Sequence, residues 1–101
     1  MKIKTSELTG AALNWAVEEA GDKDHTYVPR AYSTDWAFGG PIIERNGLSV
    51  MPDTGLDWWV AHQGTVHYGY GPTPLVAAMR CFVASKLGDE VDVPEELKGE
   101  K

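Results

Sequence analysis

The stretch that decides the fold reads PTPLVAAMRCFVASKLG and covers residues 72–88. Thr73 stands where a helix takes its capping hydroxyl, and Pro74 has the fixed backbone angle that suits a first helical position. Gly88 follows Leu87 and closes the pattern. These signals predict a helix that buries one face. Its apolar residues recur three and four positions apart: Leu75, Ala78, Met79, Phe82 and Val83.

The residues before this helix predict a small antiparallel sheet. Residues 48–51 alternate in period two, which is typical of a strand, and the turn formers of residues 52–55 follow. Residues 57–62 are rich in β-formers and predict the second strand of a hairpin. After a short turn, residues 65–68 predict a third, shorter strand. The glycines and prolines of residues 69–74 are then expected to break the sheet.

A second helix is predicted near the N-terminus. Thr5, Ser6 or Thr9 can cap its start, and Gly21 stands where a helix-ending glycine belongs. Ile3, ahead of this helix, suggests either a short strand or a simple tether. One apolar face is predicted from the spacing of Leu13, Ala16, Val17 and Ala20.

A long segment without helical periodicity follows at residues 21–40. Its length is unusual for a loop in a compact domain, and such loops are often functional. Because four of the ten aromatic residues lie in it, we expect an ordered loop held by its rings rather than a disordered linker. The next segment, residues 41–47, predicts either one or two helical turns or a short strand. The four rings are those of Tyr27, Tyr32, Trp36 and Phe38.

The predicted fold class is α+β: a small antiparallel sheet, either a hairpin or a three-stranded meander, flanked by an N-terminal and a C-terminal helix. Both helices are expected on one face of the sheet. The 101 residues fit one domain. We place this α+β domain at residues 1–88 and expect residues 89–101 to form an acidic, flexible tail.

The composition excludes several classes of protein. The chain has 9 Lys+Arg against 15 Asp+Glu, a formal net charge of −6, so it lacks the basic character that DNA or RNA binding needs. No apolar run approaches the ~20 residues of a membrane-spanning helix. We also expect no signal peptide, and therefore a cytoplasmic location.

The residues suited to catalysis or metal binding form no recognisable set. Cys81, the one cysteine, lies in the apolar pattern of the last helix and is expected to be a small core residue. His62 and His67 flank a predicted turn, where surface histidines are expected and a metal site is the alternative. Asp35 and Glu44 suggest paired carboxylates, although an aspartate after Ser-Thr more often caps a turn or helix. We predict no catalytic residue, no metal and no cofactor.

Three motifs of the sequence carry a family resemblance. The first is KTSELTGAAL at residues 4–13. The second is STDWA at 33–37, which runs into GGPIIER at 39–45. The third is GPTPLVAAMRC at 71–81 with VASKLGD at 83–89. Together they resemble the phage NinX-like family over nearly the whole chain. The resemblance implies a protein of tailed bacteriophages or prophages that acts in the bacterial cytoplasm, and it implies no particular activity.

The start of the last helix, residues 69–74, is the most informative candidate site. A helix N-terminus exposes unpaired N–H groups, and glycines let a phosphate or carboxylate approach the backbone. Tyrosines beside it offer stacking faces; a tight turn with a capping threonine is the alternative. Together with the motif residues and two arginines, the candidate ligand-binding residues are Ser33, Thr34, Asp35, Trp36, Gly39, Gly40, Arg45, Tyr68, Tyr70, Gly71, Thr73 and Arg80.

Trp58 and Trp59 are neighbours on a predicted strand, so their rings point to opposite faces and one of them needs a cover. This predicts an apolar patch and a homodimer or larger assembly. We favour a non-enzymatic phage accessory protein that binds or sequesters a small anionic, nucleotide-like ligand, of the kind used as signals in bacterial antiviral defence. A protein-interaction adaptor or inhibitor that contacts a host protein through the patch is the alternative. A small enzyme that acts on a nucleotide with Asp35, Glu44 and the histidines is the weakest hypothesis.

Overall fold

The computed structural model describes residues 1–21, 30–53, 55, 58–64 and 67–95. These residues form an α+β fold, as predicted, with three α-helices, a three-stranded antiparallel meander and a two-stranded sheet. In chain order the elements are β1 (Lys2–Lys4), η1 (Thr5–Glu7), α1 (Gly10–Ala20), α2 (Trp36–Asn46), β2 (Ser49–Asp53), β3 (Trp58–Gln63), β4 (His67–Gly71), α3 (Pro74–Leu87) and β5 (Glu90–Asp92).

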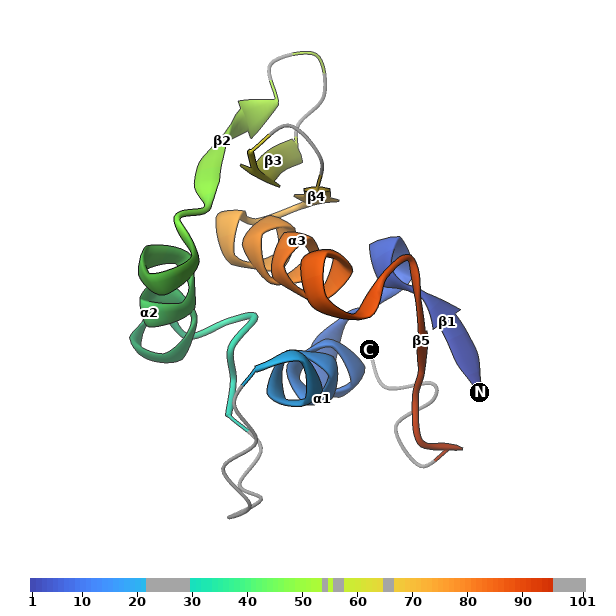
Figure 1. Ribbon diagram of the computed structural model, residues 1–101. Coiled ribbons are helices and arrows are strands. Elements are labelled where there is room, and N and C mark those ends of the chain that lie inside the picture. Colours follow the sequence, from blue (N-terminus) through green and yellow to red (C-terminus); the bar gives the residue numbers. More distant parts are fainter. Residues whose placement is uncertain (22–29, 54, 56–57, 65–66, 96–101) are drawn as a thin grey trace.

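The meander consists of β2, β3 and β4, with β3 in the middle. Ala61 in β3 lies opposite Val50 in β2 and Gly69 in β4, and α3 covers this inner face of the sheet (Figure 1). Trp59 packs against the core and Trp58 is exposed, so the two rings point to opposite faces as predicted. The sheet therefore has one face closed by a helix and one face open.

The strand boundaries differ from the prediction mainly in the third strand. The strands expected at residues 48–51 and 57–62 are β2 and β3, each displaced by one or two residues. The third strand was expected at residues 65–68, whereas β4 covers His67–Gly71. Residues 65 and 66 lie outside the described residues.

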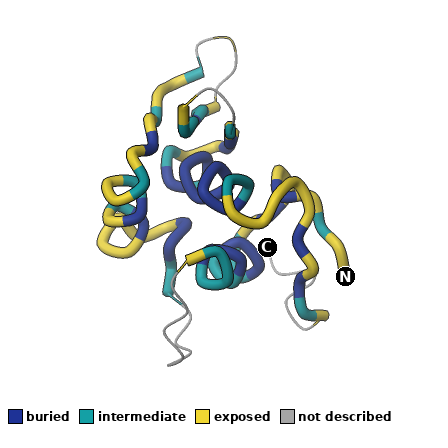
Figure 2. Tube along the Cα trace, in the orientation of Figure 1, coloured by how far each residue is buried: buried dark blue, intermediate teal, exposed yellow. Residues whose placement is uncertain are grey.

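Helix α3 is the centre of the molecule. One side of α3 contacts the sheet and another contacts α1 and α2, so α3 lies between the two layers (Figure 1). Figure 2 shows that most of α3 is buried. The predicted boundaries are confirmed: Thr73 Oγ1 accepts a hydrogen bond from the Val76 N–H at 3.1 Å, Pro74 is the first helical residue, and Gly88 ends the helix. Side chains without exposed surface include Leu13, Ala16, Ala61, Ala77, Ala78, Met79, Cys81 and Val83.

Glycines let α3 lie directly on β4. A Cβ atom added at Gly69 would stand 2.3 Å from the carbonyl oxygen of Ala77 and 2.3 Å from the amide nitrogen of Cys81. At Gly71 it would stand 2.7 Å from a side-chain carbon of Val76. The prediction that this stretch breaks the sheet is wrong, because Gly69 and Gly71 belong to β4 and serve close helix–strand packing instead.

Helix α1 confirms the predicted N-terminal helix, but its ends are made differently. Thr9 occupies the N-cap position, yet its side chain makes no capping hydrogen bond. Gly21 ends the helix with an extended backbone rather than a left-handed one, and its N–H donates to the carbonyl of Val17 at 3.0 Å. Residues 22–29 lie outside the described residues.

Helix α2 corrects two predictions. A loop was expected through residue 40 and one or two helical turns after it, whereas α2 begins at Trp36 and contains Pro41. Asp35 caps the helix, since its carboxylate accepts a hydrogen bond from the Ala37 N–H at 2.9 Å. Gly47, with φ of 62°, ends the helix in the left-handed region. Local capping at both ends thus holds a helix whose interior sequence disfavours one.

Packing supplies the rest of the stability of α2. A Cβ atom at Gly39 would stand 2.5 Å from the carbonyl oxygen of Tyr32 and 2.6 Å from Leu75. The Gly-Gly-Pro run therefore allows close approach to α3 and to the preceding loop, and this tertiary contact overrides its poor helix propensity. The part of the loop that is described is held by a ring, as expected: Tyr32 contacts Phe38 edge to face, and its hydroxyl donates to Glu18.

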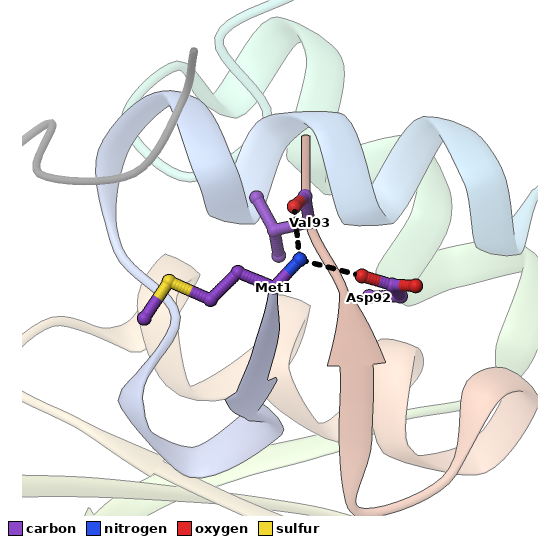
Figure 3. Close-up of polar contacts among 3 residues, drawn as sticks. All are labelled: Met1, Asp92 and Val93. Atoms are coloured by element: carbon purple, nitrogen blue, oxygen red, sulfur yellow. Dashed lines mark hydrogen bonds and ion pairs between the residues drawn. The ribbon is translucent and has the colours of Figure 1, made fainter. Parts of the chain in front are cut away.

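The two-stranded sheet corrects the predicted acidic tail. Val91 and Val93 are buried, and Val91 lies opposite Ile3 in the antiparallel pairing of β1 with β5. The amino group of Met1 donates to Asp92 Oδ1 at 2.7 Å and to the carbonyl of Val93 at 3.1 Å, and this contact lowers the pKa of the Asp92 carboxyl (Figure 3). Alternating valines between acids thus make a strand. Residues 96–101 lie outside the described residues.

Candidate functional site

A hollow with a volume of about 530 Å³ lies beside the edge strand β4. We call it the Arg80 hollow. Its walls come from the β1–η1 segment, β4, α3 and the start of β5, so it forms where the two sheets meet on α3. The lining residues that matter for chemistry are Lys4, Ser6, Tyr68, Arg80, Asp89 and Glu90.

Arg80 is a buried cation, with only 6% of its surface exposed. Its Nε donates to the carbonyl of Leu8 at 2.9 Å, and its Nη1 donates to the carbonyl of Tyr70 at 2.7 Å. Burial lowers the pKa of Arg80, because removal from water disfavours the charged form. The guanidinium thus fixes α3 to the segment before α1 and to β4.

Arg80 has no carboxylate partner among the described residues. Its Nη2 makes no hydrogen bond there, and no buried side-chain nitrogen or oxygen in that part of the chain lacks a partner. Nη2 is therefore not completely buried, and Arg80 lines the hollow with the small part of its surface that is exposed. The site presents one guanidinium edge whose positive charge is not balanced by an ion pair.

The rim of the Arg80 hollow is held by two hydrogen bonds that Thr5 donates to backbone carbonyls at the end of α3 and just after it. The Thr5 hydroxyl donates to the carbonyl of Gly88 at 2.6 Å, and the Thr5 N–H donates to the carbonyl of Asp89 at 2.8 Å. Lys4 lies opposite Glu90 in the β1–β5 register. Both signs of charge therefore reach the rim, with Lys4 exposed beside the two acids.

Tyr68 and Tyr70 lie on the open face of the sheet, each about half exposed. The Tyr68 ring lies 5.6 Å from the His62 ring, and Tyr68 also lines the Arg80 hollow. Gly71, another predicted ligand residue, faces α3 on the other side of β4. The tyrosines are available to a ligand or partner, whereas the surroundings of the glycine are filled by the helix.

Four other predicted residues meet in a separate hollow of about 270 Å³ at the start of α3. Ser33, Thr34, Trp36 and Thr73 line it together with apolar residues of α3. The Thr73 hydroxyl is already used as the helix cap, and no cation lines this hollow within the described part of the chain. Trp36 and Thr73 thus line one hollow, but its chemistry is that of an apolar pocket rather than a phosphate site.

The remaining predicted residues have local structural roles or lie apart. The Ser33 N–H and hydroxyl both donate to Asn14 Oδ1, at 3.0 and 2.8 Å, which ties the loop to α1. Gly39 is buried against the loop, and Gly40 follows it on α2. Arg45 lines two smaller hollows, of about 290 and 220 Å³, neither of which shares a residue with the Arg80 hollow.

The residues weighed for catalysis do not assemble. Asp35 is the N-cap of α2 and Glu44 lies nine residues further along the same helix, roughly 13 Å away along its axis. Cys81 is fully buried, and burial raises its pKa to about 11. Across the described ranges, no three His, Cys, Asp or Glu side chains lie close enough to hold a metal ion. No described helix is long and apolar enough to cross a membrane.

Reasoning from the sequence missed Lys4, Ser6, Asp89 and Glu90 as lining residues. From the sequence, Lys4 and Ser6 are expected in the tether or at the start of the N-terminal helix, and Asp89 and Glu90 are expected in the flexible tail. The alternation of Val91 and Val93 between acids was a strand signal that could have moved this segment into the domain. No feature of the sequence around residues 89–93 indicated that this segment would pair with β1.

The comparisons with known proteins identify one family. A family model described as "Bacteriophage P22, NinX" matches residues 4–86. The matched range includes Lys4, Ser6, Tyr68 and Arg80 of the hollow and ends before its two acids. The comparison with curated proteins found no match.

Proposed function

The chain belongs to the bacteriophage P22 NinX family, and we propose that it is a non-enzymatic phage accessory protein that binds a small anionic, nucleotide-like ligand in the Arg80 hollow. The observation that carries the proposal is the buried Arg80 guanidinium, which donates to two carbonyl groups, lines the hollow and forms no ion pair with either acid of the lining. The volume of about 530 Å³ lies within the range typical of small-molecule sites.

The chemistry of the hollow supports an anion at Arg80. A guanidinium removed from water is stabilised by a nearby negative charge, and its planar donors match the oxygens of a phosphate or carboxylate. Lys4 adds a second, exposed cation at the rim, and Ser6 adds a hydroxyl. Tyr68 offers an aromatic side chain for a base to contact.

The proposed biological setting follows from the family and the ligand class. A phage protein that holds a nucleotide tightly lowers its free concentration in the cytoplasm of the infected bacterium. Nucleotide-type signals drive antiviral responses in bacteria, so sequestration of such a signal would counter the defence of the host.

The test is isothermal titration calorimetry with adenosine monophosphate, cyclic adenosine monophosphate and inorganic phosphate as probes. Lys4→Gln should weaken nucleotide binding about two- to fivefold, as expected for an exposed charge. Lys2→Gln is the matched control, since Lys2 is the other lysine of β1 but does not line the hollow. Arg80→Lys should weaken binding by a larger factor, about tenfold or more, because the fork of donors is lost. Absence of binding by all three probes would contradict the proposal.

A second candidate function, a protein-interaction adaptor or a homodimer, is favoured by the open face of the sheet. Met51, Trp58, Tyr68 and Tyr70 are 43–49% exposed, and strand alternation places them on the face that α3 does not cover. An exposed apolar patch of this kind is typical of protein interfaces.

This second candidate is tested by sedimentation velocity. If the open face joins two copies, wild type sediments as a dimer and Trp58→Ser shifts it to the monomer. Trp36→Ser is the matched control, because Trp36 is also an exposed tryptophan, even more exposed than Trp58, but lies on α2. A monomeric wild type would exclude the homodimer hypothesis. A host protein would then be the remaining candidate partner of this face.

A further inference from the structure

Resting on the proposed function, we infer that the Arg80 hollow selects a ligand with one compact anionic group attached to a part that donates hydrogen bonds, such as a nucleoside monophosphate with an amino-bearing base. Polyphosphates are disfavoured. The inference comes from the distribution of charge around the hollow, which is not that of a general anion site.

The charged lining residues are balanced in number but separated in position. Arg80 and Lys4 supply two positive charges, and Asp89 and Glu90 supply two negative charges. Arg80 belongs to α3 and is buried, whereas both acids are exposed: Asp89 lies between α3 and β5, and Glu90 is the first residue of β5. Neither acid forms an ion pair with Arg80. The hollow therefore has a cationic floor and a mixed rim.

This separation limits how much negative charge a ligand can bring. One phosphate or carboxylate can reach Arg80 Nη2 and gain a charge-assisted hydrogen bond. Further phosphates must lie nearer the rim, where Lys4 lies opposite Glu90 in the β1–β5 register and two acids stand against one lysine. The rim then opposes the additional negative charge, because like charges in a confined site repel.

The same acids favour a complementary group on the rest of the ligand. A carboxylate accepts hydrogen bonds, so Asp89 and Glu90 suit an exocyclic amino group or a protonated amine. Ser6 can donate or accept, and Tyr68 contributes an aromatic side chain. Adenine and cytosine carry such an amino group, whereas hypoxanthine carries a carbonyl oxygen in its place.

The experiment compares adenosine monophosphate, inosine monophosphate and adenosine triphosphate by calorimetry in magnesium-free buffer, so that metal ions do not neutralise the phosphates. Wild type should bind adenosine monophosphate about tenfold tighter than either alternative. The double variant Asp89→Asn/Glu90→Gln should raise the affinity for the triphosphate about fivefold or more and reduce the preference for the amino-bearing base. Glu44→Gln/Asp53→Asn removes the same charge away from the hollow and should change neither ratio.

The outcomes separate this inference from the function on which it rests. If wild type binds the triphosphate as tightly as the monophosphate, or if the acid variant changes all three affinities equally, the inference is wrong while the ligand site stands. If no nucleotide binds to any of the three proteins, the proposed function is wrong and the inference falls with it.

Discussion

The two faces of β4 carry residues of opposite kinds. On the inner face, Gly69 and Gly71 lie against the backbone of α3, where a single Cβ atom would meet the helix. On the outer face, Tyr68 and Tyr70 are half exposed. One strand of five residues thus combines the tightest helix–strand contact with two of the most accessible rings.

This difference separates two meanings of a glycine-rich stretch before a helix. Glycines allow a ligand to approach a backbone, but they equally allow a helix to do so. In β4 the glycines allow the helix α3 to approach, not a ligand. The tyrosines that alternate with them are therefore the residues of this strand that can contact a ligand or partner. The following predictions test this division, starting with the largest expected effect.

Gly69→Ala should unfold the protein or destabilise it by about 3 kcal/mol or more, because the clash is with backbone atoms that cannot rotate away. Urea denaturation followed by circular dichroism measures the effect. Tyr68→Ala, one residue earlier on the other face, is the control. An unchanged midpoint for Gly69→Ala would show that α3 does not lie on β4 as described.

Cys81→Ser should cost about 1–2 kcal/mol, because a more strongly hydrated hydroxyl replaces a fully buried thiol, while the His67 carbonyl that accepts from Sγ at 3.5 Å remains as its partner. Cys81→Ala serves as a control that removes the sulfur without adding a polar group. Since burial raises the thiol pKa to about 11, native protein should react slowly with iodoacetamide at pH 8 and quickly in urea. Rapid native alkylation would contradict the inner position of this residue.

Thr73→Ala should cost about 0.5–2 kcal/mol, since the hydroxyl caps the Val76 N–H at the start of α3. Thr73→Asp should retain stability, because an aspartate also caps and its charge suits a helix N-terminus. Thermal melting of both variants checks the prediction. Equal losses in both would show that the cap contributes little and that packing alone positions this end of α3.

Tyr70→Ala and Tyr68→Ala should each change stability by no more than about 0.5 kcal/mol, because both rings are on the open face. They should differ in binding. Tyr68 lines the Arg80 hollow and Tyr70 does not, so only Tyr68→Ala should weaken binding of adenosine monophosphate, by about tenfold. Equal losses in the two variants would move the binding surface from the hollow to the open face.

Elements with local signals were predictable from the sequence. The boundaries of α3 follow from a capping threonine, a proline and a glycine at the correct spacing, and all three act as expected. Helix α2 has a cap at each end but a Gly-Gly-Pro interior, so its propensity argues against the helix that packing imposes. β5 was missed because its partner is β1, at the other end of the sequence.

The candidate site was predictable only in part for the same reason. Tyr68 and Arg80 were among the predicted ligand residues and line the same hollow, whereas Thr73 and Trp36 line another. The spacing of residues in the sequence cannot show which of the two hollows a residue lines. That depends on which side of β4 each chain segment passes in the folded protein.

The β1–β5 sheet also determines how the molecule responds to a pulling force. Lys2 lies opposite Asp92 and Lys4 lies opposite Glu90, so the chain enters β1 and leaves β5 at the same end of the sheet. Tension applied through the two ends would open the strands one residue pair at a time, as a zipper opens, instead of shearing all pairs together. An unfolding motor that pulls on either end would therefore separate this sheet first. The Arg80 hollow would lose one of its walls before the contact between β4 and α3 bears the force.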